Sequence, residues 1–181
     1  MQGLLCCNGF AVVWMYGGVG NEKGFIQEFR RRLQDCFCQE WFSYLESSER
    51  FELYSCFKTC LEREKYIESI EDIKYRSALS RFRAGVSSIG VHKHRHAKNE
   101  MNKNCPFCKT VTEDETHVIF VCPLYEDLRT RYLNVCNQKT LRQQLIDLCR
   151  CNTDIVISML CRYLFFMLQR RVKFTSEQLQ A

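Results

Sequence analysis

Proline is scarce in this chain of 181 residues, which has two prolines and eight glycines. Helix-breaking residues are therefore missing from long stretches, and most of the chain is free to be helical. The chain also has no Asn-x-Ser/Thr acceptor and no basic leader with a cleavage site, so its thirteen cysteines do not indicate a secreted, disulfide-bonded protein. We expect an intracellular protein, nuclear or cytoplasmic, whose thiols are reduced.

A long apolar run is missing too. The most apolar segment, residues 155–168, is interrupted by Ser158 and Arg162 and is shorter than the roughly 20 residues that cross a bilayer, so we expect no membrane partner. Hydrophobic residues still make up 46% of the chain and aromatic residues 13%, which is enough to bury a real core.

Patterns typical of enzymes are also missing. No Ser/His/Asp or Cys/His arrangement is visible, and the glycines between residues 17 and 24 lack the Lys-Ser/Thr pair of a P-loop. The chain has no Asp-Asp pair of the kind that holds two metal ions in a polymerase. We therefore expect that the chain is not an enzyme on its own.

What is present is helical periodicity along most of the chain. Over residues 25–45, apolar side chains recur every three or four positions and polar side chains fill the opposite face. Similar patterns predict helices over 48–61, 69–85, 124–135, 141–148 and 155–172. The helix over 69–85 is expected to begin at a cap near Ser69 and to turn Ile73 inward. The expected fold is mainly α, a helical bundle with an inserted CCHC zinc knuckle.

The knuckle is predicted from three cysteines and one histidine that lie within residues 105–122. Two residues separate Cys105 from Cys108, so both sulfurs can face one ion from a tight turn. His117 and Cys122 are separated by four residues, which fits about one helical turn. Because four protein ligands fill the tetrahedron that zinc prefers, the spacing predicts one structural Zn²⁺ ion and leaves no open position for catalysis.

The cysteines allow other interpretations. A CxxC pair can also be a redox dithiol, but that motif follows a strand, and the approach to Cys105 is polar. The pairs at 36 and 38 and at 149 and 151 have no nearby histidine, which argues against a second metal site. We expect most of the remaining cysteines to be small apolar core residues.

Three acidic residues precede the histidine of the knuckle. One of Glu113, Asp114 and Glu115 could accept the free ring N–H of His117 and fix its tautomer. The alternative is that all three are exposed in a solvated turn.

Positive charge is concentrated in the segment that leads into the knuckle. Between residues 76 and 104 there are seven lysines and arginines and a single acidic residue. Such a surface suits the phosphates of RNA or DNA, with an affinity that falls steeply with salt. We predict that the residues that bind nucleic acid are Arg76, Arg81, Arg83, Lys93, Arg95, Lys98 and Lys103.

A helical wheel divides these charges between two sides. Lys74 and Arg81 fall on one flank of the apolar stripe of their helix, and Arg76 and Arg83 fall on the other. The alternative is that these long side chains merely cover the core with their stems. The three histidines at 92, 94 and 96 could share a strand face and bind a metal, but the cations between them favour a basic loop over 92–103.

This combination of residues resembles the zinc-binding region that follows the polymerase thumb in reverse transcriptases of LINE-like (non-LTR) retrotransposons. The motifs that carry the resemblance are the run from Arg76 to Gly85, Cys105-Pro-Phe-Cys108, Glu115-Thr-His117, Cys122-Pro-Leu-Tyr125 and Arg129. Weaker similarity extends over about residues 10–135. The resemblance implies that Cys105, Cys108, His117 and Cys122 bind zinc and that the region helps to hold template RNA or target DNA.

The chain departs from that family because it has neither the catalytic aspartates of the palm nor room for an endonuclease. It is expected to be a fragment or descendant of the C-terminal part of such an element. We expect three regions, which are an N-terminal helical region over 1–98 that resembles the post-thumb segment, the zinc knuckle over 99–123 and C-terminal helices over 124–181.

The function predicted from the sequence is that of a non-catalytic, zinc-binding module that contacts nucleic acid. The alternative is a protein-interaction module, or a degenerate relic, that packs through the apolar C-terminal helix on a neighbouring polymerase domain or another protein.

Overall fold

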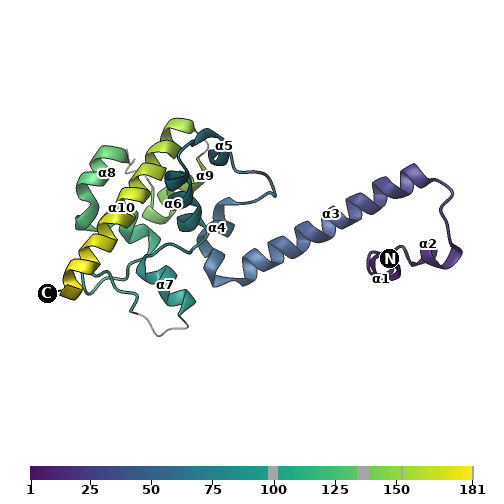
Figure 1. Ribbon diagram of the computed structural model, residues 1–181, viewed down its shortest axis with the longest axis horizontal. Coiled ribbons are helices and arrows are strands. Elements are labelled where there is room, and N and C mark those ends of the chain that lie inside the picture. Colours follow the sequence, from purple (N-terminus) through teal and green to yellow (C-terminus); the bar gives the residue numbers. More distant parts are fainter. Residues whose placement is uncertain (98–101, 134–138, 152, 181) are drawn as a thin grey trace. The chain divides into compact units, whose positions relative to one another are not determined.

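The computed structural model describes residues 1–97, 102–133, 139–151 and 153–180 (Figure 1). Within these ranges the chain is mainly helical and has no β-strand, although an isolated antiparallel bridge joins Asn104 and Thr112. The prediction of a mainly α fold is confirmed. The chain forms two compact units, Met1–Ser47 and Ser48–Ala181.

The first unit consists of α1 (Gln2–Cys7), α2 (Ala11–Tyr16) and the long α3 (Glu22–Ser47). The ring of Phe10 lies edge-on against Phe25 and Phe29 of α3, with centroids 5.4 and 5.2 Å away. At the start of α3, the side chain of Asn21 accepts the backbone N–H of Gly24, which satisfies one of the free donors of the first turn. The predicted helix over 25–45 is confirmed and is slightly longer than predicted.

The second unit contains the other helices, the hydrophobic core and the metal motif. Its elements are η1 (Glu49–Phe51), α4 (Glu52–Phe57), α5 (Tyr66–Ser69), α6 (Ile73–Arg83), α7 (Gly90–His96), η2 (His117–Val121), η3 (Pro123–Tyr125), α8 (Glu126–Tyr132), α9 (Leu141–Arg150) and α10 (Asp154–Gln180).

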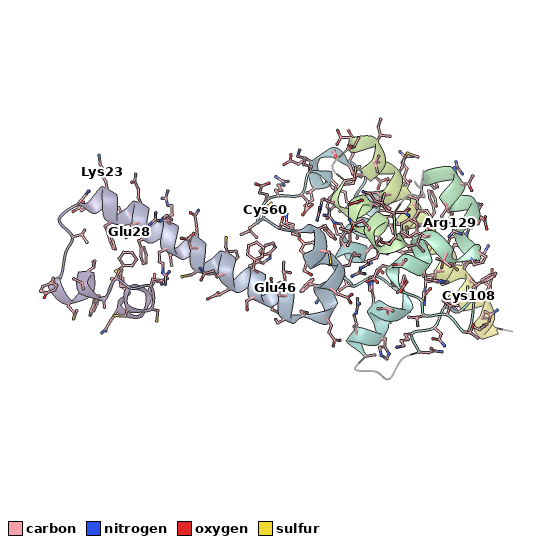
Figure 2. The ribbon with its side chains drawn as sticks, turned by 180° about the vertical axis from the view of Figure 1, so that it is seen from behind. Lys23, Glu28, Glu46, Cys60, Cys108 and Arg129 are labelled. Atoms are coloured by element: carbon pink, nitrogen blue, oxygen red, sulfur yellow. The ribbon has the colours of Figure 1, made fainter. Side chains whose placement is uncertain are left out.

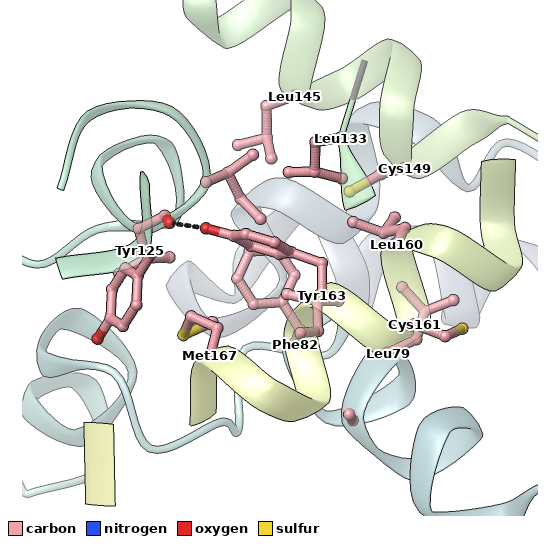
Figure 3. Close-up of a cluster of buried hydrophobic side chains, with 14 of the residues drawn as sticks. Leu79, Phe82, Tyr125, Leu133, Leu145, Cys149, Leu160, Cys161, Tyr163 and Met167 are labelled. Atoms are coloured by element: carbon pink, nitrogen blue, oxygen red, sulfur yellow. Dashed lines mark hydrogen bonds between the residues drawn. The ribbon is translucent and has the colours of Figure 1, made fainter. Parts of the chain in front are cut away.

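Helix α10 is the centre of this unit, and α6 and α8 pack against it (Figure 1). Its residues Leu160, Tyr163, Leu164 and Met167 are almost completely buried, as is Phe82 of α6. Figure 3 shows this core and the hydrogen bond that the hydroxyl of Tyr163 donates to the carbonyl of Val118. The apolar face of the last helix is therefore largely covered by the chain's own core.

The start of α6 differs from the prediction. The helix is capped by Asp72, whose carboxylate accepts the backbone N–H of Lys74 at 3.1 Å, whereas Ser69 ends the separate short helix α5. Asp is as good a cap as Ser. At about 100° per residue, Ile73 lies roughly 180° around the helix from the buried Phe82, so it faces solvent and is 72% exposed. The expectation that Ile73 points inward was wrong.

Residues 92–96 form part of helix α7 instead of the basic loop that was expected. At helical spacing, His92, His94 and His96 cannot share one face as they would on a strand. His92 is completely buried, so it belongs to the core and not to a solvated loop. The prediction of a loop failed because the contacts that bury His92 come from residues distant in the sequence.

Most of the remaining cysteines are not core residues, contrary to expectation. Outside the metal motif, only Cys149 and Cys161 are buried in the described part of the chain, whereas Cys6, Cys7 and Cys60 are exposed. The structure divides the chain after Ser47, and the predicted region boundaries near residues 98 and 123 lie inside the second unit. No single helix among the described residues is long and apolar enough to span a membrane.

Replacement of Tyr163 by Phe tests the link between α10 and the segment that carries His117. The change leaves the carbonyl of buried Val118 without its donor, so we expect the free energy of unfolding to fall by about 1–3 kcal/mol in urea titrations. Tyr132→Phe is the control, because its ring also packs against α10 but its hydroxyl bonds to no described residue. Equal stability of both variants would contradict the role of this bond.

Candidate metal centre and its surroundings

Cys105, Cys108, His117 and Cys122 come together in the structure as the sequence predicted. Each offers one ligand atom, and all four atoms lie within 4.8 Å of one another. The Cys105 and Cys122 sulfurs are 3.8 Å apart, the Cys108 and Cys122 sulfurs 3.9 Å, and the Cys108 sulfur lies 3.6 Å from Nε2 of His117. These separations are too long for a disulfide, whose sulfurs are about 2.05 Å apart.

The separations match the edges of a tetrahedron around one ion. With zinc–sulfur bonds of about 2.3 Å and zinc–nitrogen bonds of about 2.0–2.1 Å, a regular tetrahedron has S–S edges of about 3.8 Å and S–N edges of about 3.6 Å. The cluster can hold a metal ion, and its dimensions are consistent with zinc. Since all four positions are filled by protein, the arrangement suits a structural ion.

A tight turn presents the first two ligands. The backbone N–H of Cys108 points at the sulfur of Cys105 at 3.5 Å, and the N–H of Lys109 donates to the carbonyl of Cys105 at 2.8 Å. Lys109 closes the turn with φ at 63°, in the left-handed region that costs a residue with a Cβ roughly 1–2 kcal/mol. Such strain persists only where the surrounding structure fixes the turn.

A wide helical turn presents the other two ligands. Residues His117–Val121 form a π-helical turn, in which the N–H of Cys122 donates to the carbonyl of His117 at 2.8 Å. This five-residue closure brings two side chains that are five positions apart back to the same side. Pro123 follows at the first position of η3, where its missing N–H costs nothing, and the chain leaves the site towards α8.

Three sulfurs this close together in a largely buried site cannot all ionise without a nearby cation. A hydrogen bond from Cys122 lowers the pKa of the Cys105 thiol, and the same bond raises the pKa of Cys122. Burial, and then the negative charge of Cys105, raises the pKa of Cys108. The three sulfurs therefore share protons among themselves, and all three can be thiolates only when a positive ion replaces those protons.

Among the described residues, no acidic side chain accepts the ring N–H of His117, so that alternative was wrong. Asp114 instead accepts the backbone N–H of His117 at 2.6 Å and caps the π-helical turn. Glu113 and Glu115 bind other partners, and the buried Nδ1 of His117 has no hydrogen-bond partner among the described residues. The alternative of a solvated turn fails as well, because Glu113 and Glu115 are buried.

Glu113 connects the metal motif to two helices. We use "metal hairpin" for residues 103–113, whose ends are joined by a 2.8 Å bond from the N–H of Glu113 to the carbonyl of Lys103. The fully buried carboxylate of Glu113 accepts two bonds from Arg171 of α10, at 2.7 and 2.6 Å, and one from the N–H of Gly90 at 2.6 Å. It therefore caps α7 and neutralises a buried arginine at once.

Gly90 allows the metal hairpin to approach α7. A Cβ at this position would lie 2.5 Å from the carbonyl oxygen of Lys103, which is a clash with backbone. The N–H of the next residue, Val91, donates to the carbonyl of Glu113 at 3.1 Å. The first turn of α7 is thus fixed directly by the metal hairpin.

Glu115 holds the buried imidazole of His92. The N–H of Ser87 donates to Nδ1 of His92 at 3.2 Å, which places the ring proton on Nε2, 2.9 Å from Oε1 of Glu115. Burial alone would raise the pKa of Glu115, but the hydrogen bond from His92 and the positive charge of Arg95 lower it to about 2. The Ser87 hydroxyl also lies 2.7 Å from Nδ1, so this nitrogen is bonded twice at the start of α7.

Several of the predicted nucleic-acid-binding residues are engaged inside the protein. Arg83 is 5% exposed, pairs with Glu64 at 3.0 Å and lies over the ring of Phe57. Arg95 pairs with Glu115 at 3.2 Å and with Glu52 at 3.0 Å.

Arg76 likewise donates to the backbone carbonyl of Ile67 at 2.8 Å. These arginines stabilise the fold. This agrees with the alternative interpretation, in which long cationic side chains cover the core with their stems. Lys98 lies outside the described residues, and Lys103 is exposed beside Glu49 and Glu52.

Arg81 and Lys93 instead line an open groove between α6, α7 and α10, with a volume of about 1150 Å³. Lys74 and Lys173 line it as well, and no described residue of the lining is acidic. The helical wheel places Lys74 and Arg81 on one flank, and the structure confirms that they share the groove. Sequence reasoning missed Lys173, because the predicted helix ends one residue before it.

The four cations differ in how they are paired. Lys74 lies 2.9 Å from Asp72 and Lys173 lies 3.9 Å from Glu177, and both pairs are exposed and therefore weak. Within the described part of the chain, neither Arg81 nor Lys93 pairs with a carboxylate.

No family model matches the chain, and neither a curated protein nor a solved structure matches it. The resemblance in the sequence therefore rests on the motif residues themselves.

Metal analysis of the purified protein tests the centre. We expect about one zinc ion per chain, and we expect Cys108→Ser and His117→Ala to lower both the zinc content and the melting temperature, because metal binding is coupled to folding. Cys60→Ser is the matched control, since this thiol is exposed and outside the cluster. If the ligand variants kept their metal, or if Cys60→Ser lost it, the assignment of the ligands would be wrong.

Replacement of Glu113 by Gln tests the junction between the metal hairpin, α7 and α10. The change leaves the guanidinium of Arg171 buried without its counter-charge, and removing one partner of such a pair costs about 3–5 kcal/mol of unfolding free energy. Glu68→Gln breaks an exposed pair with Arg63 and should cost under about 1 kcal/mol. Similar losses in urea titrations of the two variants would show that the buried pair has no special role.

Proposed function

We propose that this chain is a non-catalytic helical module that is stabilised by one structural zinc ion and contacts RNA or DNA through phosphates. The observation that carries this proposal is the groove, whose described lining contains four cations and no carboxylate. A nucleic-acid backbone presents regularly spaced negative charges, so separated cations can each bind one phosphate. Such contacts give affinity with little dependence on sequence.

In this proposal the zinc ion acts at a distance from the bound phosphates. It fixes the metal hairpin, and Glu113 of that hairpin holds the start of α7 and the Arg171 region of α10. Lys93 lies on α7 and Lys173 lies two residues beyond Arg171. The ion would therefore set the spacing of cations on two walls of the groove without contacting the ligand.

We further propose that the chain derives from the zinc-binding region of a LINE-like reverse transcriptase and acts inside the cell. Support comes from the motif residues, several of which have structural partners at the metal centre. Arg129 donates to the carbonyl of the ligand Cys122 at 2.8 Å, and Glu115 binds His92. Figure 2 shows Cys108 and Arg129 towards the same end of the second unit.

The alternative was a protein-interaction module, or a relic, that packs through the apolar C-terminal helix. That interpretation was based on the apolar character of residues 155–168. Leu160, Leu164 and Met167 are buried in the chain's own core, which accounts for this character without a partner. The acid-free groove has no such internal explanation, and it therefore favours the nucleic-acid proposal.

Charge reversal in the groove tests the proposal. We expect an Arg81→Glu, Lys93→Glu double variant to bind single-stranded and duplex oligonucleotides more weakly in fluorescence anisotropy titrations. The slope of log affinity against log salt should become shallower by about 0.7–0.9 for each phosphate that the variant no longer binds. Lys65→Glu is the single-charge control, because this lysine is exposed and does not line the groove. Absence of binding at low salt by the unaltered protein would refute the proposal.

A further inference from the structure

Part of the groove lining is apolar; we call these side chains the floor of the groove and its four cations the rim. Ala78 of α6, Val86 of the following loop, and Phe165, Leu168 and Val172 of α10 form this floor. Val172 is 56% exposed, so part of this floor is open to solvent. A surface that bound phosphates alone would gain nothing from exposed apolar side chains, and this floor indicates a ligand with flat or apolar parts as well as charge.

Polar, uncharged side chains lie among these apolar residues. Ser77 and Gln169 line the groove, as does Ser88 before α7. Hydroxyl and amide groups can donate to and accept from the edges of nucleobases. The apolar face of a docked peptide helix would instead cover these groups and leave them without partners, which is unfavourable.

Lys93 is the most recessed of the four cations. Burial and the neighbouring Arg171 guanidinium lower the pKa of Lys93, and the carboxylate of Glu113 offsets part of this effect. That carboxylate is already bound by Arg171 and by the N–H of Gly90. Lys93 is therefore a partly buried cation that lacks an anion of its own.

We infer that the groove binds a single-stranded stretch of nucleic acid, with phosphates on the cationic rim and bases on the floor formed by Phe165, Leu168 and Val172. This inference rests on the proposed function and deepens it by naming the strandedness of the ligand. Single strands can turn their bases towards apolar and aromatic side chains, and this contact tolerates any base sequence. A duplex keeps its bases stacked and paired, so it can offer the rim its phosphates but leaves the floor uncovered.

The test compares a single strand with bases, a single strand without bases and a duplex. Anisotropy titrations at low salt use an oligothymidylate of about 12 nucleotides, an abasic strand of the same length and charge, and a duplex of that length. We expect the oligothymidylate to bind at least about 5-fold more tightly than the abasic strand, which corresponds to one base in contact with the floor. We expect the binding free energy per bound phosphate to be the same for the duplex as for the abasic strand.

A variant of the floor connects this preference to the groove. Val172→Asn keeps the charge and size of an exposed side chain but removes its apolar surface, and Ile155→Asn is the control on the same helix, at a residue that is 71% exposed and outside the groove. We expect Val172→Asn to lower the preference for bases about 2-fold or more while binding of the abasic strand is unchanged. Circular dichroism melting confirms that both variants are folded.

The outcomes separate this inference from the proposed function. Equal, salt-dependent binding of the oligothymidylate and the abasic strand would overturn the inference and leave phosphate binding intact. Binding of the duplex as tight as that of the oligothymidylate would likewise overturn the inference and leave phosphate binding intact. If a polyglutamate of matched charge displaced the oligothymidylate as effectively as unlabelled oligothymidylate does, an acidic protein partner would replace the nucleic acid. No binding of any strand would overturn both proposals.

Discussion

Three sulfur ligands and one imidazole nitrogen within 4.8 Å of one another are stable together only if something offsets their mutual repulsion when the sulfurs ionise. Without a cation, the thiols share protons, as the opposite pKa shifts of Cys105 and Cys122 indicate. With one divalent ion at the centre, all three sulfurs can be thiolates and each ligand is satisfied. The tight turn at Cys105 and the π-helical turn at His117 both have geometries that this shared ion would stabilise.

The rest of the second unit is connected to this centre by a few buried contacts. Tyr163 of α10 binds the carbonyl of Val118, one residue beyond the ligand His117, and Arg129 of α8 binds the carbonyl of Cys122. The carboxylate of Glu113 accepts hydrogen bonds from the N–H of Gly90 in α7 and from Arg171 in α10. The positions of Lys93 on α7 and Lys173 on α10 would therefore depend on a centre that neither of them contacts, which separates the stabilising part of the molecule from its proposed binding surface.

The sequence predicted that the four residues of the candidate metal centre lie together, because their geometry is local and two short turns suffice to bring the four side chains together. It also predicted that Arg81 and Arg83 lie on opposite flanks of α6. It could not show which flank is covered, because Phe57, Tyr66 and Glu64 surround Arg83 through tertiary packing. The histidine-rich segment differs from the predicted loop for the same reason, because its helix depends on contacts made by distant residues in and beside the metal hairpin.

The most direct test of the account is X-ray absorption at the zinc edge on the purified protein. The account predicts a four-coordinate ion with three sulfur neighbours at about 2.3 Å and one nitrogen neighbour at about 2.0 Å. A first shell of oxygen and nitrogen atoms alone, or protein that is folded and free of metal, would contradict it.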